Sequence, residues 1–137
     1  MPADKLLTGG CLCGAVRYEA AGEPFNSGVC HCVTCRQASG APMVAYFSVR
    51  AAGFRLLSGE LTDYASSDFA VRRFCPACGS QLLFDDSRYP DEIDICTATL
   101  DDPAAVPPTF HIWARSRIPW VKLDDGLPVY SERTGSA

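Results

Sequence analysis

The residues most able to do chemistry in this chain are its eight cysteines, seven of which fall into close groups. They occupy positions 11, 13, 30, 32, 35, 75, 78 and 96. Thiolates at such short spacing are typical zinc ligands, because one turn then supplies two of them. A disulfide framework is disfavoured, since 137 residues need no covalent staples and no export signal is recognisable. A thioredoxin-type redox CxxC is also disfavoured, because no βαβ pattern surrounds either CxxC.

Two of the cysteine pairs are suited to a closed metal site. The segment Cys75-Pro76-Ala77-Cys78-Gly79 is a CPxCG knuckle, whose glycine permits a tight turn around a metal. The segment Gly10-Cys11-Leu12-Cys13-Gly14 is a second pair with a trailing glycine. Residues two apart in an extended chain point the same way, so this CxC pair can share one ion. The sequence therefore predicts a structural zinc site made by Cys11, Cys13, Cys75 and Cys78, which should contribute to folding.

The third group, Cys30-His31-Cys32-Val33-Thr34-Cys35, offers three thiolates and has no trailing glycine. Three protein ligands with one exchangeable position are typical of a catalytic zinc. Two residues compete to complete this site: His31, whose side chain should point away from a metal held by its neighbours, and Cys96. Iron is a possible occupant, but zinc is the default metal for tetrahedral sulfur sites. We therefore predict two zinc ions, one structural and one catalytic, the second held by Cys30, Cys32 and Cys35.

Polar residues beside this third group are candidates for substrate contacts. They are His31, Arg36 and Gln37, and Arg36 could receive a carboxylate through a bidentate contact. For each of them an ordinary structural hydrogen bond or a solvated charge is an equally good interpretation. Other conspicuous residues are interpreted as structural: His111 as a satisfied histidine, Cys96 as a small buried hydrophobe, and Phe110, Trp113 and Trp120 as core.

The elements that must position these cysteines are mostly β-strands. Short runs with period-two alternation or apolar, aromatic character, separated by turn residues, predict strands at 15–20, 43–49, 54–57, 61–65, 70–74, 81–84, 93–99 and 109–114. The runs at 61–65 and 70–74 flank a polar stretch and should form a hairpin. One short helix is predicted at 33–39. We expect antiparallel sheets in a single domain over 1–137.

The bulk composition limits the classes of partner. The net charge of −4 and the absence of any dense basic cluster argue against nucleic-acid binding. No segment is apolar over the length of a membrane span, and residues 1–7 contain no apolar run typical of a signal peptide. We expect a cytoplasmic protein in which the thiols stay reduced.

The order CxC, CHCxxC and CPxCG resembles the glutathione-dependent formaldehyde-activating enzyme family, also called the centromere protein V-like family. The resemblance extends to segments 9–18, 35–41 and 111–128, which include His111-Ile112-Trp113, Pro119-Trp120 and Asp125-Gly126-Leu127-Pro128. It implies an Mss4-like, mainly β fold of antiparallel sheets organised around the four-cysteine structural zinc site. It also implies that Cys11, Cys13, Cys75 and Cys78 are structural ligands and that Cys30, Cys32 and Cys35 are catalytic ones.

The activity that this resemblance implies is that of a carbon–sulfur lyase joining glutathione and formaldehyde to S-hydroxymethylglutathione. A small-molecule thiol such as glutathione would then bind the open metal position. The alternative is a non-catalytic zinc-binding module for protein interaction, in which a protein ligand completes the second site. A monomer and a homodimer paired through an edge strand are both compatible with the sequence.

Overall fold

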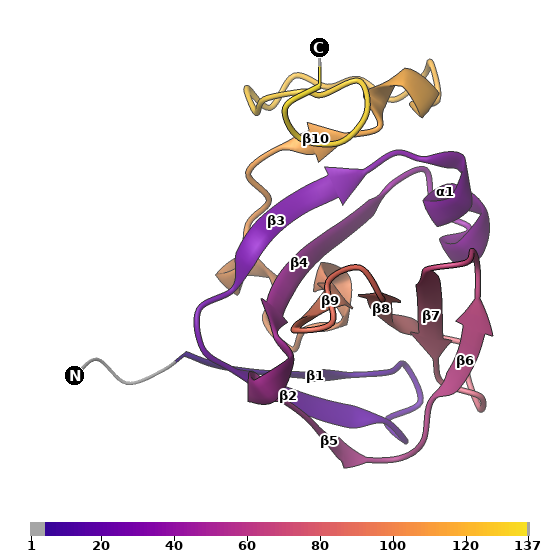
Figure 1. Ribbon diagram of the computed structural model, residues 1–137, viewed down its shortest axis with the longest axis vertical. Helices are drawn as coiled ribbons and strands as arrows, with labels where there is room; N and C mark the ends of the chain where they lie inside the picture. The colour runs from indigo at the N-terminus through magenta and orange to yellow at the C-terminus, as the bar shows by residue number, and fades with distance from the viewer. Residues whose placement is uncertain (1–4, 137) are drawn as a thin grey trace.

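The structure is a computed structural model in which residues 5–136 are described; residues 1–4 and 137 of the predicted domain lie outside them. Strands dominate the described chain, and the one α-helix is short (Figure 1). The strands are β1 (Leu6–Gly10), β2 (Arg17–Ala21), β3 (Phe25–Cys30), β4 (Val44–Arg50), β5 (Phe54–Ser58), β6 (Thr62–Ala65), β7 (Ala70–Phe74), β8 (Gln81–Asp86), β9 (Glu92–Cys96) and β10 (His111–Ile112). The helix is α1 (Val33–Ser39), and 3-10 turns lie at Ala51–Gly53, Thr97–Thr99, Pro103–Ala105 and Ala114–Ser116.

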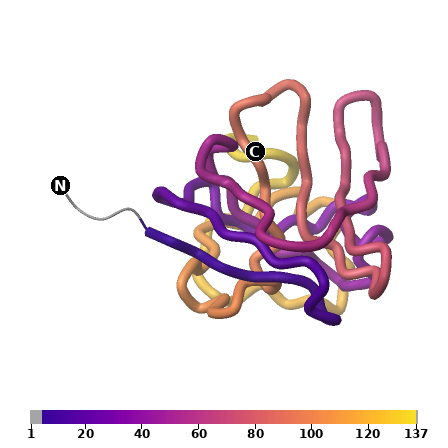
Figure 2. The backbone as a smooth tube through the Cα atoms, turned by 90° about the horizontal axis from the view of Figure 1, so that it is seen from below, coloured from indigo at the N-terminus to yellow at the C-terminus, as the bar shows by residue number. Residues whose placement is uncertain are grey.

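The strands form two sheets. A three-stranded sheet has the order β1-β2-β5, and a seven-stranded sheet has the order β10-β3-β4-β9-β8-β7-β6. Figure 1 shows the small sheet lying across one end of the larger, strongly curved one. Figure 2 shows the β6–β7 and β8–β9 hairpins projecting side by side from this sheet. The predicted mainly β fold of antiparallel sheets is confirmed, with one addition, because β10 pairs with β3 in parallel.

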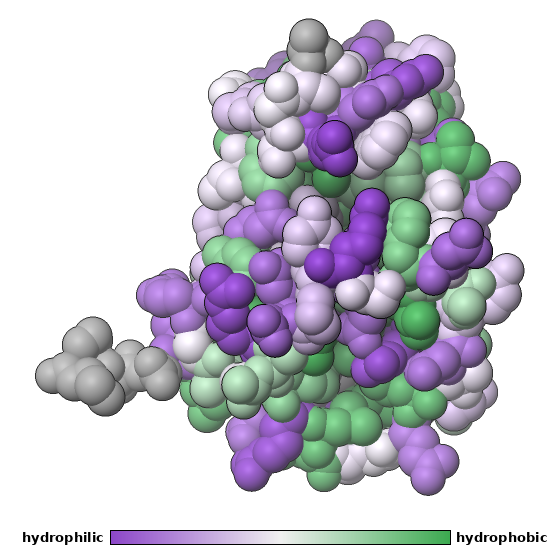
Figure 3. Space-filling view, viewed as in Figure 1, coloured by the Kyte–Doolittle hydropathy of each residue, from purple (hydrophilic) through white to green (hydrophobic). Residues whose placement is uncertain are grey.

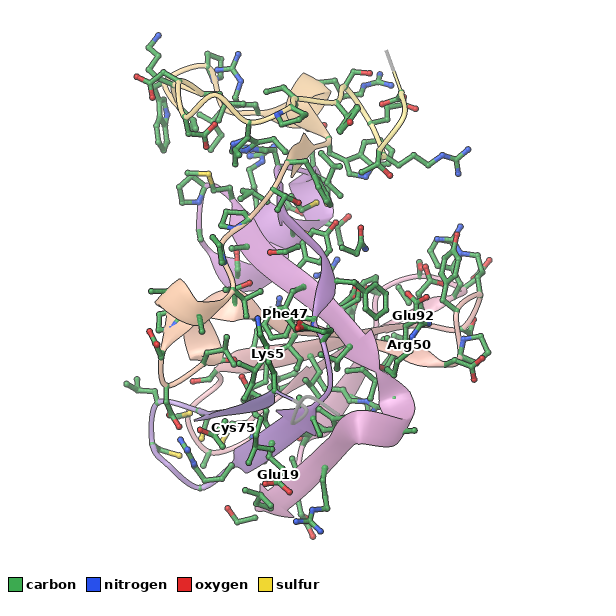
Figure 4. All side chains as sticks on the ribbon, turned by 90° about the vertical axis from the view of Figure 1, so that its left-hand side faces the viewer. Lys5, Glu19, Phe47, Arg50, Cys75 and Glu92 are labelled. Carbon is green, nitrogen blue, oxygen red and sulfur yellow. The ribbon has the colours of Figure 1, made fainter. Side chains whose placement is uncertain are left out.

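The core fills the space between the two sheets. In β2 the side chains of Tyr18 and Ala20 point inward, as period-two alternation requires, and both are fully buried. From the larger sheet Phe47, Leu82 and Ile95 are also fully buried, and Figure 4 shows Phe47 in the middle of the molecule. Cys75 belongs to this same cluster, so one cysteine group is built into the edge of the core.

Helix α1 is held by its ends and not by an apolar face. Its N-cap is Cys32, whose Sγ accepts a hydrogen bond from the backbone N–H of Cys35 at 3.3 Å. Its C-cap is Gly40, at φ 71°, whose N–H donates to the carbonyl of Arg36. None of its seven residues is buried. An isolated helix this short is marginal in water, so its stability depends on contacts outside the helix.

Several of the predicted elements are confirmed. The helix at 33–39 has the predicted bounds, and the hairpin at 61–65 and 70–74 is the antiparallel pair β6–β7. Others are wrong in length. The strand predicted at 93–99 ends at Cys96 and continues as a 3-10 turn, and the strand at 109–114 shrinks to His111–Ile112. Strands β1 and β3 are additional to the predicted set.

The longest helix in the described part of the chain has seven residues, and none of its helices is long and apolar enough to cross a membrane. On the face shown in Figure 3, polar and apolar residues are interspersed. That face therefore carries no single broad apolar surface.

Candidate metal centres

The first cysteine cluster has the geometry of a closed tetrahedral site. The sulfur atoms of Cys11, Cys13, Cys75 and Cys78 all lie within 4.8 Å of one another. Sγ of Cys13 is 3.6 Å from that of Cys11 and 3.9 Å from that of Cys75. A tetrahedron with Zn–S bonds of about 2.3 Å has S···S edges of about 3.8 Å, whereas a disulfide needs about 2.05 Å. The cluster therefore fits zinc, and all eight cysteines are free.

Two tight turns from different sheets bring these four sulfurs together. After β1 the N–H of Gly14 donates to the carbonyl of Cys11, and after β7 the N–H of Gly79 donates to that of Cys75. Gly79 has φ 79°, which agrees with the role predicted for the knuckle glycine. The expectation that the CxC pair is extended is wrong, because residues 11–16 form a turn after β1. Figure 4 shows Cys75 beside the three-stranded sheet.

The second cluster lies at the junction of β3 and α1. The sulfur atoms of Cys30, Cys32 and Cys35 lie within 4.8 Å of one another. Cys30 ends β3, Cys32 caps α1 and Cys35 lies in the first helical turn. Within residues 5–136 no fourth histidine, cysteine or carboxylate joins this group. Neither of the two competing ligands, His31 and Cys96, therefore completes the site in this structure.

The electrostatics of the second cluster also fit a bound cation. Hydrogen bonds from the thiols of Cys30 and Cys35 lower the pKa of Cys32 to about 2. The hydrogen bond with Cys32 raises the pKa of Cys30 far above its usual range, and burial adds to this effect. Without a cation, ionisation of one of these thiols makes ionisation of the other two less favourable. All three sulfurs can carry charge together only when a metal ion lies between them.

His31 points away from the second cluster, as the sequence predicts for a residue between two ligands. It is fully buried, and its Nε2 lies 2.9 Å from Nδ1 of His111, while Nε2 of His111 lies 2.8 Å from Oδ2 of Asp125. The carboxylate accepts a hydrogen bond from Nε2–H of His111, and the facing nitrogens of the two histidines form a second hydrogen bond. Burial, reinforced by His111, lowers the pKa of His31. The prediction that His111 is a satisfied structural histidine agrees with these two hydrogen bonds.

The expected substrate contact of His31 has no support from its position, since its side chain has no exposed surface. Its Nδ1 is buried without a hydrogen-bond partner. His31 is therefore better placed to fix the backbone between Cys30 and Cys32 than to touch a dissolved molecule.

Arg36 and Gln37 line a pocket immediately after the second cluster. Its volume is about 280 Å³, and Ala41, Ile118 and Trp120 contribute to its wall. The Nε atom of Arg36 is buried without a hydrogen-bond partner. Trp120 is 67% exposed, so its assignment to the core is wrong, whereas Phe110 is buried as expected. Neither the pocket at Arg36 nor a larger one of about 330 Å³, between β7, β8 and the β8–β9 loop, is lined by a cysteine.

Two further residues near the cluster differ in how well the sequence predicts them. Cys96, predicted to be a small buried residue, is intermediate in exposure; its Sγ lies 3.9 Å from Nε2 of Gln81, and burial of the thiol raises its pKa to about 11. Arg72 is not among the site residues predicted from the sequence. It is 7% exposed, and its two terminal nitrogens lie 3.9 and 3.8 Å from Sγ of Cys35. The alternation of β7, with Ala70 and Arg72 on its buried face, was the signal that could have identified it.

Comparison with known proteins shows which family this chain matches. The sequence profile of the family "Glutathione-dependent formaldehyde-activating enzyme" matches residues 6–116. The chain is 28% identical over 130 residues to a "Putative glutathione-dependent formaldehyde-activating enzyme" of Halomonas elongata, covering 87% of this chain and 82% of that protein. It is 37% identical over 76 residues to "Uncharacterized lyase C29B12.13" of Schizosaccharomyces pombe, and this match covers 56% of this chain and only 55% of the yeast protein.

A solved structure supports the same relationship. The crystal structure of a Rhodobacter sphaeroides protein superposes with a TM-score of 0.57 at 30% identity, covering 72% of this chain and 93% of that one. The profile match includes Cys11, Cys13, the whole CHCxxC group, Cys75 and Cys78. The chain therefore belongs to the glutathione-dependent formaldehyde-activating enzyme family.

Proposed function

We propose that this protein is a zinc-dependent carbon–sulfur lyase or thiol-adduct synthase acting on a small thiol such as glutathione and on formaldehyde or a related aldehyde. Family membership and the names of its relatives support a lyase-type enzyme. The observation that carries the proposal for this chain is the second cluster: three converging sulfurs with no fourth ligand within residues 5–136, at the start of a helix whose Arg36 and Gln37 line a pocket.

The two clusters are assigned different roles. Cys11, Cys13, Cys75 and Cys78 would hold a structural zinc, because four thiolates leave no position for a substrate. Cys30, Cys32 and Cys35 would hold a second, catalytic zinc, which when bound supplies an open coordination position that favours the thiolate form of an incoming thiol. The sulfur geometry supports two sets of metal ligands. The proposal adds that each set holds one zinc ion.

The reaction is an addition to a carbonyl. The thiolate sulfur of the substrate attacks the aldehyde carbon and forms a C–S bond. The C=O π pair moves to oxygen, which takes up the proton that the thiol released. The reverse reaction breaks the C–S bond and returns the pair to sulfur, giving thiol and aldehyde without an oxidant or reductant.

The pocket beside α1 would hold the remainder of the thiol substrate. Glutathione carries two carboxylates, and of the described residues Arg36 is the one charged residue that lines this pocket. A guanidinium suits a carboxylate, because its N–H groups match the two oxygens. The side-chain amide of Gln37 is available for the peptide groups of the thiol, and Trp120 offers an apolar wall.

The test measures metal content and catalysis on the same sample. We expect two zinc ions per chain, a thiolate-to-cobalt charge-transfer band that responds to glutathione in cobalt-substituted protein, and faster exchange between glutathione and its formaldehyde adduct, followed by NMR, than the uncatalysed background. Cys35→Ala should lose one metal ion and this exchange. Cys96→Ala is the matched control, because it removes a buried thiol outside both clusters.

A wild-type protein whose second metal gives no spectral response to any thiol would contradict the enzyme assignment. It would leave the non-catalytic zinc-binding module as the function. Full activity in Cys35→Ala after loss of one zinc would contradict the proposed mechanism.

A further inference from the structure

Arg72 is a buried arginine that has no carboxylate partner among the described residues. It lies on β7 and is 7% exposed. Its neighbour Arg73 pairs with Asp63 and Asp85, as arginines of this chain commonly do with carboxylates. Arg72 instead donates from Nε to Oγ of Ser66 at 3.2 Å and stacks over the ring of Phe84, with its Cζ 5.0 Å from the ring centroid. A buried guanidinium without a counter-charge is costly, so its compensation must come from another group.

The nearest group able to carry that counter-charge is the second cysteine cluster. Both terminal nitrogens of Arg72 face Sγ of Cys35, at 3.9 and 3.8 Å. Ser66 lies in the β6–β7 turn, where its N–H donates to the carbonyl of Ala70, so the side chain that holds Nε of Arg72 is itself fixed. The guanidinium is therefore held from one side by the hairpin and directed with its other side at a metal ligand.

A charge count explains the arrangement. Three thiolates and one divalent cation leave a net charge of about −1 at the centre, and a fourth thiolate from a substrate makes it about −2. In a site of low dielectric constant this excess charge weakens the binding of the metal–thiolate set unless a cation lies nearby. Arg72 supplies a charge of about +1, which neutralises the resting centre and halves the charge of the thiol-bound one.

We infer that Arg72 is the charge partner of the three-cysteine centre: it compensates the negative charge of the metal-bound thiolates through Cys35 and thereby tightens metal binding and favours entry of a fourth, anionic thiolate. This inference rests on the proposed assignment of Cys30, Cys32 and Cys35 as metal ligands. Arg72 is a positioning residue under this assignment, since it acts on the metal through Cys35.

The position of β7 gives this contact a second consequence. Arg72, at the middle of the strand, contacts the three-cysteine cluster, and the strand ends next to Cys75 of the four-cysteine cluster. Figure 1 shows β7 running between α1 and the small sheet. A change at Arg72 must therefore be tested on both metals, because one strand serves both centres.

The experiment compares Arg72→Met, Arg72→Lys and Arg73→Gln with the wild type. Methionine keeps an unbranched apolar stem to pack on Phe84 but removes the charge and every N–H donor. Lysine keeps the charge but cannot direct two N–H groups at Cys35 while a third reaches Ser66. Arg73→Gln is the matched control, because it removes an arginine from the next position of the same strand, where the partners are carboxylates.

The readout is the dissociation constant of the second metal, measured by competition with a chromophoric chelator, together with the energy of the thiolate-to-cobalt band. We expect the second metal to bind about 10- to 100-fold more weakly in Arg72→Met, with an intermediate loss in Arg72→Lys and none in Arg73→Gln. The cobalt band should shift in both Arg72 variants, because the N–H···S contacts change, and the first metal should remain bound.

If Arg72→Met and Arg72→Lys both bind the second metal as the wild type does, the inference is overturned. If Arg72→Met fails to fold, Arg72→Lys and Arg73→Gln still decide between the outcomes. The failure of the proposed function looks different: the second metal would be lost in Arg72→Met as expected, while the wild type would show no spectral or catalytic response to glutathione.

Discussion

At the scale of single residues, some ionisable side chains are buried by the sheet, and burial changes their pKa or requires a partner of opposite charge. Arg72 beside Cys35 is one case, and Asp94 on β9 is another. Asp94 accepts a hydrogen bond from Oγ of Ser48 at 2.6 Å, and Ser48 is fully buried. Burial raises the pKa of Asp94 to about 6, and the nearby carboxylates of Glu92, Asp86 and Asp85 contribute in the same direction. The native state therefore binds a proton at Asp94 more tightly than the unfolded chain does.

The sign of the pH dependence follows from that difference. Between the unfolded pKa of 3.8 and the folded value of about 6, the native state holds more protons than the unfolded state, so stability falls as pH rises through this window. From about pH 5 to about pH 8 the cost at this group is about 1 kcal/mol. We predict that Asp94→Asn gains stability relative to the wild type over this range, measured as the difference in urea unfolding free energy at each pH.

Comparing the two proteins at each pH cancels the shared effect of pH on zinc binding, because Asp94 belongs to neither cysteine cluster. A stability difference that stays constant from about pH 5 to about pH 8 would contradict the raised pKa.

At the scale of elements, the sequence predicts those features that depend on residues close together in the chain. The helix predicted at 33–39 has the observed bounds, and the structure shows what ends it: Cys32 as N-cap and Gly40 as C-cap. The members of both cysteine clusters follow from spacing. Strand β3 is harder, because Gly28 weakens its strand character and the reason for this glycine lies far away in the chain. A Cβ at this position would collide with the ring of Phe110.

Contacts that depend on the sheet order cannot be predicted from local patterns. The parallel pairing of β10 with β3 brings His111 beside Val29, and so beside His31, over a separation of 80 residues. The sheet order β3-β4-β9-β8-β7 likewise brings Arg72 to Cys35, over a separation of 37 residues. The sequence contains the buried alternation of β7, but only the assembled sheet shows what lies above it.

The hydrogen-bonded chain from Asp125 through His111 to His31 joins three elements of the fold. It links the C-terminal segment, β10 and the β3–α1 junction, and two of its three members are buried. His111→Phe keeps an aromatic ring but leaves Nε2 of His31 buried without a partner, so we predict a loss of about 1–3 kcal/mol in unfolding free energy. Denaturant titration of the zinc-loaded protein measures it.

Asp125→Asn is the control for this prediction. The side chain of Asp125 is 48% exposed, and an asparagine oxygen still accepts from His111, so the expected loss is well below that of His111→Phe. Equal and small effects of both substitutions would show that the chain does not join these elements.

At the scale of the whole molecule, the two cysteine clusters differ in which elements they join. The four-cysteine cluster joins the turn after β1 to the turn after β7, and so ties the small sheet to the large one across more than sixty residues of sequence. Its Cys75 is part of the hydrophobic core. The three-cysteine cluster spans only the junction of β3 and α1, and α1 buries none of its residues. With metal bound at both clusters as proposed, we expect its loss from the four-cysteine cluster to open the fold and its loss from the three-cysteine cluster to release only a short helix.

Graded chelation tests this difference directly. With increasing chelator we predict that the metal of the three-cysteine centre leaves first, because three protein ligands hold it less firmly than four, and that the β-sheet circular dichroism stays unchanged at this stage. Removal of the remaining metal should coincide with cooperative unfolding. Cys78→Ser should give insoluble or unfolded protein, while Cys35→Ser should stay folded with one metal. A soluble Cys78→Ser protein with an unchanged melting temperature would refute the structural role of the four-cysteine site, because a loop that long cannot lose its closure without a cost in stability.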